Sequence, residues 1–114
     1  MSAITTHILD TASGQPGAGI PVTLERKTQT AGWETIAEGI TDVDGRVKDL
    51  LPTTEAFTAG HYRLTFDTGG YFAMQSVDCF FPMVTVGFAV KDPDQHYHVP
   101  LLLSPFGYST YRGS

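Results

Sequence analysis

The stretch MVTVGFAVK at residues 83–91 alternates between large apolar residues and small or polar ones. Successive side chains of a β-strand point to opposite faces, so this period of two predicts a strand with one buried face. The stretches IPVTLERKT (20–28) and HYRLTFD (61–67) show the same period. The buried faces are expected to hold Val84, Val86, Phe88 and Val90, then Ile20, Val22 and Leu24, then Tyr62, Leu64 and Phe66. The residues between them should face water, as in a sandwich of two sheets.

Five more stretches rich in β-branched and aromatic residues complete the set, at 4–10, 33–41, 45–49, 96–103 and 107–112. Turn signals separate them: a cluster at 13–17 (SGQPG), Asp44-Gly45 as a hairpin signal, and 104–107 (SPFG) closing the last hairpin. The helical candidate is 71–77. About eight strands with one short helix predict an all-β, two-sheet sandwich forming a single domain over 1–114.

Composition excludes several classes of protein. Twelve carboxylates stand against seven Lys and Arg, and no basic cluster is present, so nucleic acid is not an expected partner. Cys79 is the only cysteine, which rules out an intrachain disulfide. The N-terminus lacks a secretory leader, and no apolar run approaches the ~20 residues that span a bilayer. We therefore expect a cytoplasmic protein with no membrane partner.

Chemically useful side chains are dense in the last nineteen residues, HYHVPLLLSPFGYSTYRGS (96–114). His96 and His98 are two apart on a strand, so both should face outward while Tyr97 and Val99 face the core. This pair could be two solvated surface histidines, or two ligands of a metal site completed by His7. His7, in the first strand, should also face away from the core.

These groups acquire meaning if they converge with Arg46. Histidine can take a proton from water near neutral pH, and arginine presents a planar fork of donors to carboxylate, imide or ureido oxygens. A serine hydroxyl and a tyrosine ring add a polar contact and a stacking surface. Such a set suits hydrolysis of a small, planar, polar ring. No Gly-x-Ser-x-Gly elbow supports an acyl-serine mechanism.

Four motifs together resemble the 5-hydroxyisourate hydrolases, the transthyretin-related enzymes of urate breakdown. They are the terminal YRGS (111–114), HYHVPLL (96–102), HILD (7–10) and DGR (44–46). The resemblance extends over essentially the whole chain. It implies a prealbumin-like sandwich assembled as a homotetramer, a dimer of dimers, with active sites in a channel where outward sheet faces meet.

The resemblance also implies a site and a reaction. The catalytic residues would be His7, Arg46, His98 and Ser114, with Tyr111 and Arg112 shaping the substrate pocket alongside His7 and Arg46; His96 does not match a catalytic position. The small-molecule substrate would be 5-hydroxyisourate, a purine derivative, hydrolysed to 2-oxo-4-hydroxy-4-carboxy-5-ureidoimidazoline without metal or cofactor. Which histidine acts as the base stays open.

Two alternatives remain. Transthyretin, the carrier branch of the family, shares LLSP (102–105) and YST (108–110) but lacks the YRGS end and the two site histidines, so a small-ligand carrier without catalysis is the second hypothesis. The third is the metal site formed by His7, His96 and His98.

Overall fold

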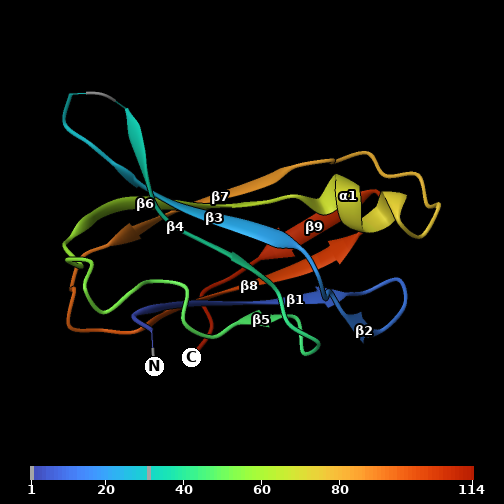
Figure 1. Cartoon of the computed structure of the whole chain (residues 1–114), viewed down its shortest axis with the longest axis horizontal. Coiled ribbons are helices and arrows are strands. Elements are labelled where there is room, and N and C mark those ends of the chain that lie inside the picture. The colour runs from blue at the N-terminus through green and yellow to red at the C-terminus, as the bar shows by residue number, and fades with distance from the viewer. Residues whose placement is uncertain (1, 31) are drawn as a thin grey trace.

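Two β-sheets pack face to face in the computed structural model, which describes residues 2–30 and 32–114 (Figure 1). The predicted domain over 1–114 includes residues 1 and 31, which lie outside the described residues. The first sheet has the order β2 (Gln15–Pro16), β1 (Ile4–Asp10), β8 (Tyr97–Ser104), β9 (Gly107–Thr110), and β5 (Arg46–Val47) also pairs with β1. The second has the order β4 (Trp33–Ile40), β3 (Pro21–Lys27), β6 (Gly60–Phe66), β7 (Val84–Val90). The predicted all-β sandwich is confirmed.

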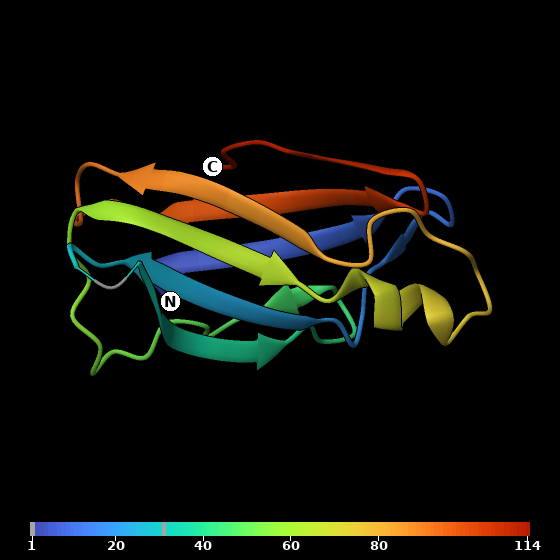
Figure 2. The same cartoon turned by 90° about the horizontal axis from the view of Figure 1, so that it is seen from above.

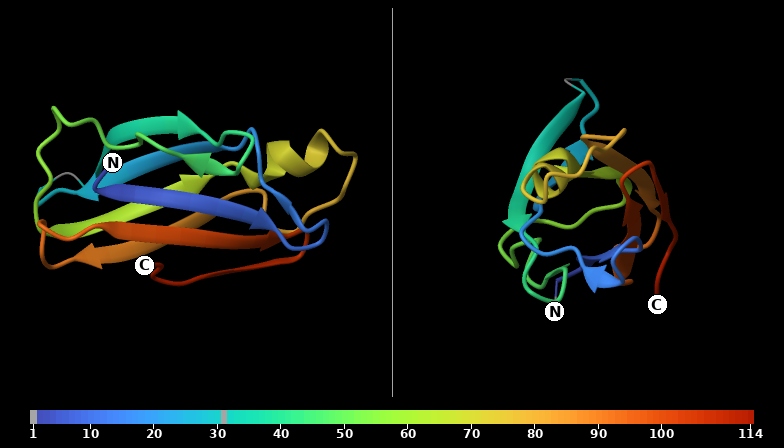
Figure 3. Two further views of the ribbon diagram at one scale, coloured as in Figure 1. Left: turned by 90° about the horizontal axis from the view of Figure 1, so that it is seen from below. Right: turned by 90° about the vertical axis from the view of Figure 1, so that its right-hand side faces the viewer.

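The core lies between the sheets, which Figure 2 and the end-on view in Figure 3 show as two layers. Of the ten residues predicted to face inward on 20–28, 61–67 and 83–91, nine are buried. Phe88 is the exception, because it lies only partly buried against the core, with its ring stacked on Tyr62. The alternation of apolar residues therefore predicted the buried face of each strand.

Three local predictions need correction. The turn cluster at 13–17 contains β2, a two-residue strand paired with Leu9 and Asp10. The helix α1 spans Thr68–Ala73 rather than 71–77, because the Asp67 side chain accepts a hydrogen bond from Gly70 N and starts the helix earlier. The Asp44-Gly45 turn connects β4 to β5, yet β5 pairs with β1. The two strands flanking the turn therefore do not form the predicted hairpin.

Gly45 allows β5 to approach β1 closely. Its φ is +76°, and a side chain there would collide with the carbonyl oxygen of Ile8. The Ile8 N–H donates to the Gly45 carbonyl at 2.8 Å. Arg46, the next residue, then sits directly opposite His7 across the sheet.

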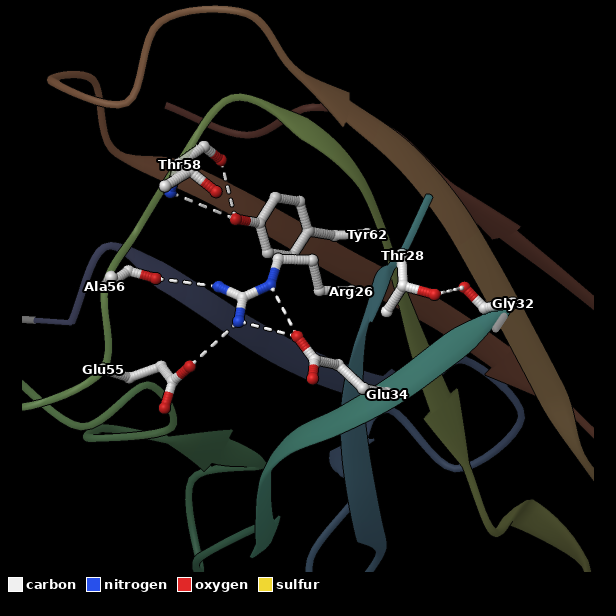
Figure 4. Close-up of polar contacts among 8 residues, drawn as sticks. All are labelled: Arg26, Thr28, Gly32, Glu34, Glu55, Ala56, Thr58 and Tyr62. Carbon is white, nitrogen blue, oxygen red and sulfur yellow. Dashed lines mark hydrogen bonds and ion pairs between the residues drawn. The ribbon is translucent and has the colours of Figure 1, made fainter. Parts of the chain in front are cut away.

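The segment between β5 and β6 is anchored through Arg26 of β3 (Figure 4). Its guanidinium donates to Glu34 of β4 at 2.8 Å, to the carbonyl of Ala56 at 2.9 Å and to Glu55 at 3.1 Å. Tyr62 Oη donates to the Thr58 carbonyl at 2.7 Å in the same region.

In the part of the chain that the structure describes, no helix is long and apolar enough to cross a membrane.

Candidate active site

Adjacent strands of the first sheet bring the predicted site residues together. β1 runs parallel to β8 with Thr5 opposite His98, and antiparallel to β5 with His7 opposite Arg46. Thr5 and His7 are half-buried, whereas their neighbours Ile4, Thr6 and Ile8 are buried. His7, His98 and Arg46 thus lie on the outer face of the sheet, away from the core.

A cavity of about 430 Å³ opens on this face. It contains three of the six predicted site residues, Arg46, His98 and Ser114. Its remaining lining residues are Thr5, Thr6, Val47, Lys48, Asp49 and His96. The volume falls within the range of roughly 300–1,000 Å³ typical of small-molecule sites.

The other predicted residues lie around this cavity. Tyr111 and Arg112 line a second cavity of about 230 Å³, and His98 borders both. His7 lines neither cavity, but it is paired with Arg46 in the sheet, and its charge acts on His98. The structure therefore gathers the other five predicted residues around His98.

His98 is held at both edges of its ring. On one edge, Nδ1 lies 2.8 Å from Thr5 Oγ1, and the same hydroxyl lies 3.0 Å from His96 Nε2. On the other edge, a Cβ added at Gly113 would come within 2.5 Å of His98 Cδ2, so only glycine fits there. Gly113 N also donates to the His98 carbonyl at 2.9 Å.

The C-terminal segment runs back alongside β8 after β9 ends at Thr110 (Figure 3, left). Arg112 secures it: Arg112 lies over the ring of Tyr97, 4.5 Å from the ring centroid, and donates to Gln95 Oε1 at 3.0 Å. With the bridge between Gly113 and His98, these contacts place Ser114 at the cavity.

The environment of His98 lowers its pKa below the ordinary value of 6.5. Burial is the largest cause, because it penalises the charged imidazolium, and the positive charges of His96, Arg46 and His7 add to the effect. A hydrogen bond with the Thr5 backbone acts in the opposite direction. The net effect keeps the imidazole neutral near pH 7, in the form that can accept a proton.

The HIUase/Transthyretin family model matches residues 4–113 of this chain, nearly its whole length. The chain belongs to this family. Among curated relatives, the 5-hydroxyisourate hydrolase of Salmonella typhimurium is 49% identical over 111 residues, which are 97% of this chain and 80% of the relative.

Solved structures similar to this chain include both a 5-hydroxyisourate hydrolase and a transthyretin. The structure of Klebsiella pneumoniae 5-hydroxyisourate hydrolase is similar with a TM-score of 0.83 and 37% identity, covering 97% of this chain and 98% of the other. Sea bream transthyretin in complex with thyroxine gives a TM-score of 0.90 and 36% identity, covering 97% and 94%. The backbone therefore does not distinguish the hydrolase from the transthyretin as the better match, and the side chains of the site must be compared instead.

The structure does not support the alternative hypothesis of a metal site formed by His7, His96 and His98. Among residues 2–30 and 32–114, no three or more His, Cys, Asp or Glu side chains are grouped so that they could hold a metal ion. The ring nitrogens of His96 and His98 converge instead on the hydroxyl of Thr5.

Sequence reasoning missed four residues of the site. Thr5 bridges the two histidines, Gly113 packs against His98, and Lys48 and Asp49 line the larger cavity. For Thr5 a signal existed, because a residue two positions before His7 on a strand shares its face. Gly113 belongs to the YRGS motif, but no local pattern showed that it would pack against His98, or that Lys48 and Asp49 would lie at the cavity.

Proposed function

We propose that the protein hydrolyses 5-hydroxyisourate to 2-oxo-4-hydroxy-4-carboxy-5-ureidoimidazoline, a step of urate degradation, using water as the nucleophile and no cofactor. The observation that carries the proposal is the position of His98, which borders the same cavity as Arg46, in surroundings that lower its pKa. The named hydrolases among the relatives support it.

Each site residue has a role that its chemistry suits. His98 and His7 orient the attacking water and remove its proton as the water adds to the ring carbonyl; the adjacent ring C–N bond then breaks, and the proton passes from the imidazole to the leaving nitrogen. Arg46 binds the ring oxygens and stabilises the negative charge that develops on the carbonyl oxygen. Ser114 hydrogen-bonds the water or a histidine, while Tyr111 and Arg112 shape the neighbouring wall.

We further propose that the enzyme acts in the cytoplasm as a homotetramer, a dimer of dimers. Support comes from the single chain, which leaves its site open: Arg46 is exposed and His7 half-buried on an outer sheet face. A large apolar side chain is also exposed beside the site, since Tyr111 of the second cavity is 58% exposed. A second copy facing this sheet would exclude water from the cavity and strengthen its electrostatic interactions.

A passive carrier is the second candidate, favoured by the likeness to a transthyretin bound to thyroxine. The lining of the cavity argues for catalysis instead, because Arg46, His96 and His98 are ionisable groups that a carrier of an aromatic ligand does not need. Ligand binding at micromolar concentration without any hydrolysis would favour the carrier.

The test is the ultraviolet decay of freshly generated 5-hydroxyisourate with and without protein. We expect decay to accelerate in proportion to enzyme concentration, and His98→Asn to reduce the enzymatic rate by about 10²–10⁴-fold, the usual contribution of a general base. The matched control is His61→Asn, which changes an exposed histidine on β6 of the other sheet and should leave the rate unchanged. Near-normal turnover by His98→Asn would contradict the assignment.

A further inference from the structure

The Thr5 hydroxyl lies between two imidazole rings. Its Oγ1 is 2.8 Å from Nδ1 of His98 and 3.0 Å from Nε2 of His96. The two rings are nearly parallel, with an interplanar angle of 15° and centroids 6.4 Å apart. Thr5 reaches both because it sits opposite His98 in the parallel pairing of β1 with β8.

Proton counting links the two rings. A threonine hydroxyl has one proton to donate and two lone pairs that accept, whereas a neutral imidazole carries a proton on only one nitrogen. If the hydroxyl donates to His98 Nδ1, the proton of His98 must sit on Nε2, and no lone pair remains there to take a proton from water. If the hydroxyl donates to His96 Nε2, His98 can donate from Nδ1 and keeps a free lone pair on Nε2.

The placement of the ring edges favours the second arrangement. The Nδ1 edge of His98 faces Thr5 and the Cδ2 edge packs against Gly113, so Nε2 is the ring nitrogen left for the cavity.

We propose that Thr5 is a positioning residue that holds His98 in its Nδ1–H tautomer, while His96 accepts the Thr5 hydroxyl proton on its Nε2. His98 then presents an unprotonated Nε2 to the cavity, as a general base requires. The effect on turnover rests on the proposed function, whereas the tautomer is a property of the free protein.

Other charged and titratable groups around the pair come from β1, from β5 and the residues after it, and from the C-terminal segment. They are His7, Arg46, Lys48, Asp49, Tyr111 and Arg112. These groups remain in place when the Thr5 hydroxyl is removed. A comparison of variants at one pH therefore isolates the contribution of the hydroxyl.

The direct test is ¹⁵N NMR of the imidazoles in free protein labelled at histidine, for the wild type, Thr5→Val and Thr5→Ser. Valine keeps the branched shape without the hydroxyl, and serine keeps the hydroxyl. The control Thr85→Val removes a threonine hydroxyl that pairs with Thr65 on the other sheet. We expect wild-type His98 to show a protonated Nδ1 and an unprotonated Nε2, Thr5→Val to mix the tautomers, and Thr5→Ser and the control to match the wild type.

Turnover gives the second readout. Thr5→Val should lower kcat about 10- to 100-fold with little change in KM, because the wrong tautomer cannot take the proton from water, and Thr5→Ser should restore most of the rate. A wild-type His98 protonated on Nε2 would overturn the inference, and so would unchanged His98 shifts in Thr5→Val, which would mean that the Thr5 backbone alone fixes the tautomer. Absence of wild-type hydrolysis would refute the proposed function, while the ¹⁵N shifts would still decide the tautomer.

Discussion

Replacing Gly113 with alanine tests whether the C-terminal segment positions the ring of His98, the proposed base. The added Cβ would lie 2.5 Å from His98 Cδ2, 3.3 Å from His98 Cγ and 3.2 Å from Pro100 Cγ. Ordinary van der Waals contact begins near 3.4 Å, so the ring and the segment must separate by about 0.9 Å. The backbone of Gly113 is not the source of the effect, since its φ lies outside the left-handed region.

The ring of His98 has little room to accommodate that displacement. Its opposite edge already lies 2.8 Å from the Thr5 hydroxyl, so a movement of 0.9 Å toward Thr5 would compress a hydrogen bond beyond any normal length. The ring must therefore rotate, or the segment must lift and break the 2.9 Å bond from Gly113 N to the His98 carbonyl. Misplacing a catalytic group by about 1 Å reduces rates by roughly 10²-fold, equivalent to about 2.7 kcal/mol.

The assay is the ultraviolet decay of 5-hydroxyisourate, with thermal unfolding measured in parallel. Gly113→Ala should lower kcat/KM about 100-fold and leave the unfolding transition nearly unchanged, because Gly113 lies beyond β9. The control is Gly107→Ala on β9, where a Cβ would meet only Ser104 Oγ at an ordinary 3.7 Å. A Gly113→Ala enzyme within threefold of the wild type would refute the claim that the ring is clamped from this side.

Three further outcomes are expected. Because burial and neighbouring cations lower the pKa of His98, the acid limb of kcat/KM should lie below pH 6.5. Arg46→Gln removes one cation and should move that limb to higher pH while slowing turnover. An acid limb at the same pH in the Arg46→Gln profile would contradict the claim that Arg46 lowers the pKa of His98. Deleting residues 111–114 should abolish hydrolysis but leave the circular dichroism spectrum of the sandwich unchanged, since the last strand ends at Thr110. Activity in the truncated protein would exclude these residues from the site. Treatment with a chelator should leave turnover unchanged, and loss of activity that added metal restores would contradict the proposed metal-free reaction.

The strands were predictable where alternation is regular. The first predicted strand, 4–10, matches β1 at both ends, because buried and half-buried residues alternate along it without interruption. Shorter elements were not predictable in this way. β2 is two residues long and formed by Gln15 and Pro16, which read as part of a turn. Helix α1 is six residues long, contains the poor helix formers Gly69 and Gly70, and depends on the Asp67 cap.

The site was predictable only in part, for a physical reason. Alternation placed His7 and His98 on outward faces, because it requires only the local period of a strand. It does not say which strands become neighbours. The parallel pairing of β1 with β8, some ninety residues later in the chain, brings Thr5 to His98, and β5 pairs with β1 instead of the preceding β4. These long-range pairings complete the site, and no local pattern contains them.

The side chains around His98 lie on a face of the sandwich that the fold itself does not constrain. The fold requires only that inward residues pack, so the outer face of β5, β1 and β8 is free to vary without loss of the core. Catalysis adds a stricter demand, because a base must be fixed in orientation and tautomer. In this chain Thr5 holds one edge of the His98 ring and Gly113 closes on the other, so residues near both ends of the sequence act on one imidazole. The YRGS motif thus contributes more than polar groups, because its glycine packs directly against the ring of the proposed base.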